Sequence, residues 1–247
     1  MTITAAIPRS RTFDFRLAVG GALALMALLL LVDPSVVDLY VAHLFYAPGE
    51  GFIGRRSFWL ETVLHDRAKA MVIGLGLLVC IGFLASLALS RFAPWRRQLG
   101  YLVLAMGLST AVVTPLKALS AVHCPWSLTE FGGVETHTPL LGTRAETAKP
   151  GRCWPGGHAS TGFSLLALFF VLRDRHPRGA RVALGIALGL GVAFSLGRML
   201  QGAHFLSHNI WTLLIDWLIC VLCYRGLLYR PGEVQALDPV SGTRKAI

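Results

Sequence analysis

Three separated segments of the sequence carry side chains that could act together on a phosphate group. They are Lys117, the run Gly156-Gly157-His158, and the stretch that contains Arg198, His204 and His208. A phosphate ester resists nucleophiles because its oxygens are negative, so cleaving it needs fixed positive charge, a nucleophile and a proton donor. Lys117 and Arg198 could supply the charge, and the arginine fork matches the geometry of phosphate. The imidazoles of His158 and His204 could divide the roles of nucleophile and acid.

Gly156 and Gly157 stand at the expected start of a helix. Glycine lets the backbone approach a ligand closely, and the first N–H groups of a helix attract anions. We therefore expect these amides to help hold the phosphate. Either cation alone would be better explained as a boundary residue whose long side chain reaches the membrane surface. Together with the glycines and histidines, Lys117 and Arg198 indicate phosphoryl chemistry.

The composition places this chemistry in a membrane protein. Of the 247 residues, 54% are hydrophobic and only 15% are charged, and the mean hydropathy is +0.60. A helix needs roughly 20 mostly apolar residues to cross a bilayer. Six stretches qualify, at about 16–32, 70–90, 99–122, 158–172, 182–196 and 209–229. We expect an all-α, six-transmembrane-helix bundle at 16–229, with cytoplasmic segments at 1–15 and 230–247.

Basic residues indicate the orientation of this bundle, because Lys and Arg near helix ends stay on the cytoplasmic side. Fourteen of the 23 basic residues flank the expected helices on one side, namely Arg9, Arg11, Arg16, Arg91, Arg96, Arg97, Arg173, Arg175, Arg178, Arg181, Arg225, Arg230, Arg244 and Lys245. We therefore expect both termini in the cytoplasm and the candidate residues at the periplasmic face of a bacterial inner membrane. Anionic lipid head groups explain these clusters, so we expect no nucleic-acid partner despite the pI near 10.0.

Two outward loops are long, at about 33–69 and 123–155, and long loops on one face usually carry function. In the first, the stretch SFWLETVLHDRAK is typical either of a short helix lying in the interface or of an ordinary connector. Asp216 falls inside the last apolar stretch, where a charge is costly. It is either a functional partner inside the bundle or a protonated structural group.

Three motifs, in order along the chain, resemble the signature of the type 2 phosphatidic acid phosphatase superfamily. That signature has the general form K-x6-RP, PSGH and SR-x5-H-x3-D. The matching stretches are KALSAVHCP at 117–125, PGGH at 155–158 and GRMLQGAHFLSH at 197–208. Any one of them is a weak signal, but all three keep the internal spacing and lie on one expected membrane face.

The resemblance implies a reaction without metal or other cofactor. His204 would attack phosphorus to form a phosphohistidine, while Lys117, Arg198 and the amides near Gly156 and Gly157 hold the phosphate oxygens. His158 would protonate the departing lipid oxygen, and water would then release phosphate. The family suggests substrates such as phosphatidic acid, phosphatidylglycerophosphate, undecaprenyl pyrophosphate or phosphorylated lipid A.

Other functions remain open at this point. The phosphoryl group could pass from His204 to a second lipid, which would make the protein a phosphotransferase. The chain could also be a non-catalytic lipid-binding or transport protein that has kept the fold. In each case we expect the bilayer and a lipid phosphate as partners, and no obligate protein partner.

The sequence departs from the signature at three positions. Gly156 replaces the motif serine, and Cys124 replaces the motif arginine, so that either Arg144 or Arg152 supplies the missing charge or the affinity for phosphate falls. His208 replaces the aspartate one helical turn after the nucleophile, and we expect its imidazole to orient His204. The His204 and His208 pair could alternatively bind zinc, which we consider the minor reading.

Two of the five cysteines, Cys124 and Cys153, flank the second outward loop. This loop would lie in an oxidising compartment, where disulfides persist. We therefore expect a disulfide between them, which would tie the segment of Lys117 to the turn before His158. Two unpaired thiols are the alternative.

Overall fold

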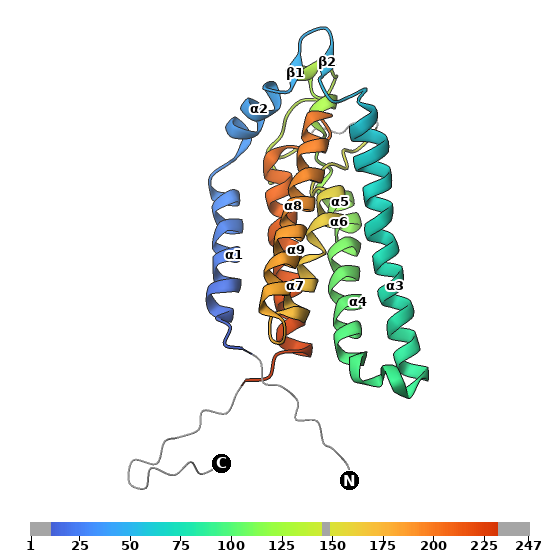
Figure 1. Cartoon of the computed structure of the whole chain (residues 1–247). Coiled ribbons are helices and arrows are strands. Elements are labelled where there is room, and N and C mark those ends of the chain that lie inside the picture. The colour runs from blue at the N-terminus through green and yellow to red at the C-terminus, as the bar shows by residue number, and fades with distance from the viewer. Residues whose placement is uncertain (1–10, 145–148, 232–247) are drawn as a thin grey trace, which may run out of the picture.

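The computed structural model describes residues 11–144 and 149–231, and most of them form long helices packed side by side (Figure 1). In chain order these are α1 (Phe15–Leu31), α2 (Ser35–His43), η1 (Trp59–Ala68), α3 (Lys69–Ala88), η2 (Ser90–Trp95), α4 (Arg96–Ala111), α5 (Val113–Ser120), η3 (Pro125–Ser127), η4 (Thr129–Phe131), α6 (Gly157–Phe163), α7 (Leu166–Leu172), α8 (Pro177–Leu200) and α9 (Leu206–Leu227). Strands β1 (Tyr46–Ala47) and β2 (Gly51–Phe52) form one short antiparallel hairpin. The expected helical class is confirmed, with this hairpin as the exception among the described residues.

Four of the described helical segments are long and apolar enough to cross a membrane: Trp59–Ala88, Ser90–Ser127, Pro177–Leu200 and Leu206–Leu227. A fifth results if α1 and α2, which meet at 84°, are taken as one broken span. Helices of this kind are those of a multi-pass membrane protein. The fourth expected span, at about 158–172, corresponds to α6 and α7, which cover only Gly157–Leu172. At roughly 1.5 Å per residue they extend about 24 Å, less than the hydrocarbon thickness of about 30 Å.

Close packing of small residues places α6 against α8. A β-carbon on Gly162 would lie 2.6 Å from the Cα of Gly191, so neither glycine could carry a side chain without separating the helices. Small residues allow membrane helices to approach closely in this way. The contact matters for the site, because α6 carries His158 and α8 carries Arg198.

The expected third span is broken after α4. Pro115 lies in the first turn of α5 and has no N–H to donate to the carbonyl of Ala111, the last residue of α4. The chain therefore continues as a second, shorter helix, and Lys117 lies in that helix rather than at the end of a straight one.

The stretch considered for an interfacial helix has a different structure. Residues 59–68 form a π-type helix that continues into α3 without a gap, and the two together count as one apolar span. No glycine or proline interrupts the chain between Trp59 and Ile73, so nothing ends the helix there. The helix that bends sharply from its neighbour is α2, which meets α1 at 84° and lies within what the sequence indicated as loop.

The basic loops lie together at one end of the bundle, and the β hairpin lies at the other (Figure 1). At the basic end the guanidinium of Arg97 donates to the carbonyl of Leu227, and that of Arg173 donates to the hydroxyl of Tyr224 at 2.8 Å. Arg173 also donates to the carbonyl of Thr12 at 2.9 Å, which holds the first described residues at this end. The described basic segments are therefore grouped as expected, whereas Arg9, Arg244 and Lys245 lie outside the residues that the structure describes.

Candidate active site

The residues singled out in the three motifs meet at the end of the bundle opposite the basic loops. Lys117 comes from α5, His158 from α6, Arg198 from the last turn of α8, and His204 from the turn between α8 and α9. The ring of His204 is buried, and Lys117, His208, Arg198 and His158 all lie close enough to act on it electrostatically. The fold thus brings together two cations and three imidazoles that are up to 91 residues apart in sequence.

Gly157 lies directly beside Lys117. A β-carbon built on this glycine would approach the Nζ and Cε atoms of Lys117 to 3.6 Å. The ammonium therefore lies against the start of α6, next to His158. This is the contact expected if Lys117 and the glycine turn share one anion.

Gly156 has a different role from the one expected. Its N–H donates to the hydroxyl oxygen of Thr212 at 2.8 Å, so this amide is already engaged within the fold. A β-carbon at position 156 would lie 2.6 Å from the Oδ1 atom of Asn209. This crowding by α9 explains why glycine stands where the family signature has serine.

Arg198 is held by side chains that the sequence did not single out. Its Nη1 atom donates to Oε1 of Gln201 at 2.8 Å and lies 4.0 Å from Oε2 of Glu61. The Nε2 atom of Gln201 donates to the same Glu61 oxygen at 2.6 Å. The Nε atom of Arg198 has no hydrogen-bond partner among the described residues. One donor of the guanidinium therefore stays available to a ligand.

The position of Gln201, three residues after Arg198 within the third motif, is a signal that could have identified it. Glu61 has no such signal, because it lies 140 residues from Gln201 in sequence.

His208 does not make the expected hydrogen bond to His204. The two ring centroids are 6.0 Å apart with the planes at 70°, and the Nδ1 atoms of both rings lack a partner within the described part of the chain. The ring of His208 is instead hydrogen-bonded to the backbone of Cys153. It can therefore act on His204 through space or through the position of the loop, rather than as a direct partner.

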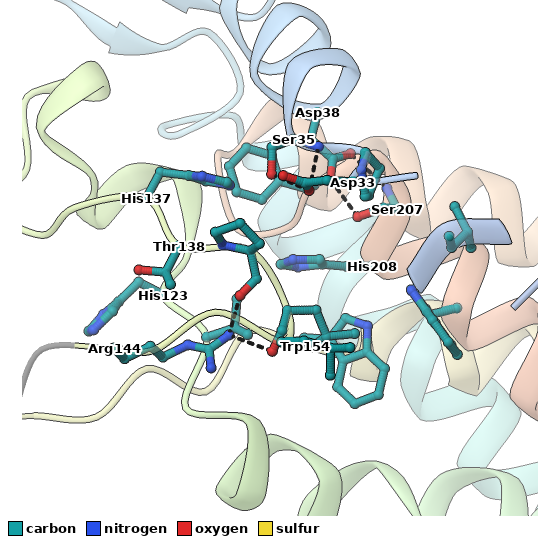
Figure 2. Close-up of a pocket in the computed structure, with 18 of the residues that line it drawn as sticks. Asp33, Ser35, Asp38, His123, His137, Thr138, Arg144, Trp154, Ser207 and His208 are labelled. Carbon is teal, nitrogen blue, oxygen red and sulfur yellow. Dashed lines mark hydrogen bonds between the residues drawn. The ribbon is translucent and has the colours of Figure 1, made fainter. Parts of the chain in front are cut away.

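The His208 ring also points into a cavity of about 80 Å³ between the 123–144 loop and the start of α9 (Figure 2). On its far side, Asp38 accepts hydrogen bonds from the backbone N–H of Ser207, at 2.9 Å, and from the Ser207 hydroxyl. This carboxylate from α2 holds the first turn of α9, and with it the segment between His204 and His208. Nothing in the sequence motifs indicated Asp38.

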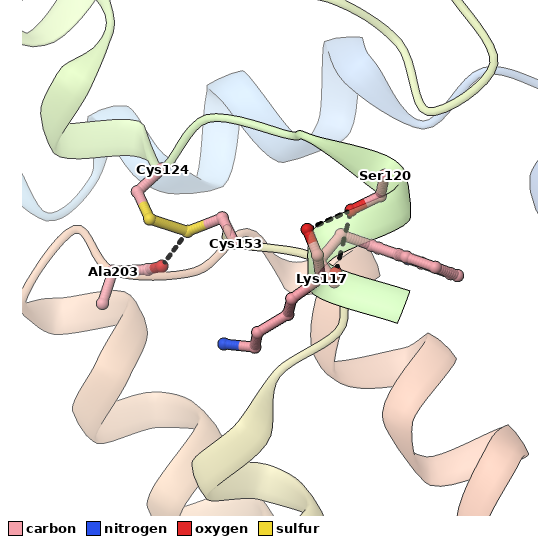
Figure 3. The surroundings of a disulfide bond; sticks show 6 residues. Lys117, Ser120, Cys124, Cys153 and Ala203 are labelled. Atoms are coloured by element: carbon pink, nitrogen blue, oxygen red, sulfur yellow. Dashed lines mark hydrogen bonds between the residues drawn. A yellow bond between two sulfur atoms is a disulfide. The ribbon is translucent and has the colours of Figure 1, made fainter. Parts of the chain in front are cut away.

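A disulfide joins Cys124 to Cys153, with the two Cα atoms 5.2 Å apart (Figure 3). It links the segment after Lys117 to the segment before His158. A second tie runs parallel to it, since the hydroxyl of Ser120 donates to the carbonyl of Trp154 at 3.0 Å.

The disulfide also bears on zinc binding. Donor atoms of Cys153, His204 and His208 all lie within 4.8 Å of one another, which is compatible with a zinc site. The Cys153 sulfur, however, is bonded to Cys124 and cannot offer a thiolate while the disulfide is intact.

The two arginines considered as substitutes at position 124 differ in their surroundings. Arg144 donates to the carbonyls of Pro139 and Leu140 at 2.9 Å and so folds back onto its own loop. Arg152 instead lies close enough to Lys117 to interact with it electrostatically. It is the candidate for the third positive charge.

The charge state of His204 follows from its surroundings. Burial lowers the pKa of its imidazole well below the usual range, and the positive charges of Lys117 and Arg198 act in the same direction. The ring is therefore neutral near pH 7. A neutral imidazole keeps a nitrogen lone pair that can attack phosphorus, whereas the protonated form has none.

A multi-pass helical bundle with cations and imidazoles gathered at one end has the features of a membrane phosphatase. The family model of the PAP2 superfamily matches residues 98–231, slightly more than half of the chain. The chain belongs to the PAP2 superfamily, which confirms the resemblance carried by the three motifs. The match contains every residue expected in the site. Searches of curated proteins and of solved structures found no match. Family membership supports a phosphatase-type activity on phosphate esters.

Proposed function

We propose that the protein is a lipid phosphate phosphatase that hydrolyses a phosphomonoester or pyrophosphate on a membrane lipid through a phosphohistidine at His204. The observation that carries the proposal is the convergence of Lys117, Arg198 and His158 on the buried ring of His204. Two cations beside a neutral nucleophile match what phosphoryl transfer requires, which is charge neutralisation and positioning.

The reaction has two steps. In the first, the lone pair of a His204 ring nitrogen forms a bond to phosphorus while the bond from phosphorus to the lipid oxygen breaks, and that oxygen takes a proton from His158. In the second, a water molecule gives a proton back to His158 and attacks phosphorus. The phosphorus–nitrogen bond then breaks, and inorganic phosphate leaves. Lys117 and Arg198 stabilise the negative oxygens in both steps.

A lipid substrate also needs a place for its hydrocarbon chains. An apolar groove of about 380 Å³ lies between α3 and α4, with Lys69 at one edge and Thr161 among its lining residues. The Thr161 hydroxyl donates to the carbonyl of Gly157 at 3.4 Å, so the groove comes within one helical turn of the glycine beside Lys117. A chain lying in this groove would bring its phosphate toward the site from the side.

The grouping of basic loops at the opposite end supports the proposed orientation. Lys and Arg are retained on the cytoplasmic side, so both termini would face the cytoplasm and the site the periplasm of a bacterial inner membrane. In this arrangement α6 and α7 would complete a six-span domain over residues 16–229. The short α6–α7 segment would then leave the site in a recess below the membrane surface.

The experiment uses the full chain, purified in detergent, with a panel of phosphatidic acid, phosphatidylglycerophosphate, undecaprenyl pyrophosphate and lipid A. Released phosphate is measured with and without a chelator. We expect chelator-resistant turnover of at least one lipid and loss of about 10³-fold or more in His204→Ala. His176→Ala, which changes an exposed histidine at the basic end, is the control.

The outcomes of this experiment separate the alternatives. Phosphate release that requires a second, acceptor lipid would favour the phosphotransferase. Absence of turnover with the whole panel would favour a non-catalytic lipid-binding or transport protein.

A further inference from the structure

We propose that a second cavity, next to the phosphate-binding residues, binds a sugar headgroup, so that the substrate is a phosphorylated sugar lipid. The inference rests on the proposed phosphatase function. The cavity has a volume of about 350 Å³ and is lined by Arg55, Glu61, Trp126, Arg198 and Gln201. Because Arg198 lines it, a group attached to the bound phosphate would enter it directly.

The walls of this headgroup cavity are fixed to the turn that follows α8. The N–H of Gly54 donates to the carbonyl of Leu200, and the N–H of Trp126 donates to the carbonyl of Gly202, both at 2.9 Å. Gly202 has a φ of +71°, and a β-carbon there would come within 2.3 Å of the Phe52 ring. Three distant segments are thus held together before any ligand binds, which reduces the entropy lost on binding.

The polar side chains of the cavity are linked to one another by hydrogen bonds. Gln201 is only 3% exposed and uses both ends of its carboxamide, accepting from Arg198 and donating to Glu61. The Glu61 side chain remains 54% exposed, so its carboxylate can accept further hydrogen bonds. The hydroxyl groups of a sugar are donors of the kind that a carboxylate accepts.

Trp126 supplies the apolar part of the cavity. Its ring lies with its centroid 5.7 Å from the Arg198 guanidinium carbon, and the residue remains 41% exposed. Tryptophan combines a large apolar ring with a polar edge, and the ring can cover the C–H face of a sugar. A carboxylate, two guanidinium groups and an exposed indole together fit a polyhydroxylated ring better than a hydrocarbon chain.

The position of Glu61 argues against a second phosphate group in the cavity. Its carboxylate lies 4.0 Å from Nη1 of Arg198, so a diphosphate held at Arg198 would place additional negative charge beside it. Like charges at such distances repel. Uncharged hydroxyl groups avoid this cost.

The cavity and the apolar groove lie along one continuous helical segment. Glu61 lies in η1 and Lys69, at the edge of the groove, is the first residue of α3. Eight residues of helix separate them by roughly 12 Å. A sugar lipid could therefore place its headgroup in the cavity and an acyl chain in the groove at the same time.

The test measures binding of headgroup fragments to the full chain in detergent by isothermal titration calorimetry. The fragments are glucosamine 1-phosphate, glycerol 3-phosphate and inorganic pyrophosphate. We expect glucosamine 1-phosphate to bind at least tenfold more tightly than either of the others. Trp126→Leu and Glu61→Gln should each remove most of that preference, whereas Trp126→Phe should keep much of it. Glu50→Gln, which makes the same change at an exposed residue of the hairpin, should leave it unaltered.

Equal binding of the three fragments, or tighter binding of pyrophosphate, would overturn the headgroup proposal. So would a parallel loss for all fragments in Trp126→Leu, because that result would indicate a general structural role. The proposed phosphatase function is tested separately, by measuring phosphate release rather than fragment binding. A protein that binds glucosamine 1-phosphate selectively but cleaves none of the lipids would retain the headgroup site and lose the enzyme assignment.

Discussion

The sulfur atom of Cys153 lies 2.6 Å from the carbonyl oxygen of Ala203, the residue directly before His204. Cys153 is also bonded to Cys124, and its backbone is hydrogen-bonded to His208. Two of the three departures from the family signature, at positions 124 and 208, therefore make contact with the same residue. The disulfide occupies a place where it can hold the turn that carries His204.

Reduction of this disulfide should impair the enzyme. Closing a loop over a sequence separation of 29 contributes about 3 kcal/mol in the chain-entropy estimate, and the loop carries the segment before His158. A phosphine reductant should lower both the melting temperature and phosphate release, the latter by tenfold or more. A variant with both cysteines changed to serine should already show these losses and should not respond to the reductant. Activity that persists after alkylation of both thiols would count against the prediction.

Replacing His158 should separate the two steps of the reaction. A general acid typically contributes 10²–10⁴-fold, so His158→Ala should slow release from a lipid phosphate by about 10²-fold or more. The aryl oxygen of an aryl phosphate leaves without protonation. Formation of phosphohistidine from this substrate should therefore be slowed less, and the intermediate should accumulate. This intermediate is measured with a substrate whose phosphoryl group is radioactive, by rapid quenching in base, where phosphohistidine is stable. Equal losses with alkyl and aryl substrates would remove His158 from the acid role.

Restoring the signature serine at position 156 should destabilise the protein. The new Cβ would meet Oδ1 of Asn209 at 2.6 Å, and overpacking of this kind costs about 1–3 kcal/mol. Gly156→Ser should therefore lower the melting temperature, and adding Asn209→Ala should recover much of it. Thermal unfolding of the two single variants and the double variant gives the interaction free energy between positions 156 and 209. Additive effects would show that the crowding is relieved elsewhere.

The neutral state of His204 should persist into mildly acidic solution. Burial and the nearby cations lower its pKa from about 6.5, so protonation should begin only well below that pH. Removing one cation with Lys117→Gln should raise the pKa and move protonation toward neutral pH, although burial still keeps it below the usual range. NMR of selectively labelled histidines follows the ring directly and does not depend on turnover. An unchanged pKa in Lys117→Gln would mean that the ammonium does not act on the ring.

Prediction from sequence succeeded where the signal is local. Apolar runs identify the long helices, because a membrane-spanning helix satisfies its backbone internally and must be apolar along its whole length. The break after α4 was not predicted, because residues 99–122 were expected to form one span; Pro115, which lacks an N–H, is the local signal that could have indicated it. The motifs also contain Lys117, His158, Arg198 and His204, which the structure brings together, while their roles in catalysis stay predictions.

Prediction failed where the signal depends on neighbours. The interfacial-helix reading of SFWLETVLHDRAK rested on apolar and polar side chains lying on opposite faces of a short helix, but the helix continues into α3. Gly156 was expected to present its amide to phosphate, yet Thr212 accepts that hydrogen bond.

The amino-acid sequence by itself determined that this is a helical membrane protein of the PAP2 superfamily, because hydropathy and motif spacing are properties of short stretches of chain. Only the tertiary structure decided what surrounds those motifs. The pairing of Gln201 with Glu61, the support of α9 by Asp38 and the crowding of Gly156 by Asn209 each join segments far apart in sequence. Such contacts arise from how helices pack against one another, and no local pattern of residues encodes them.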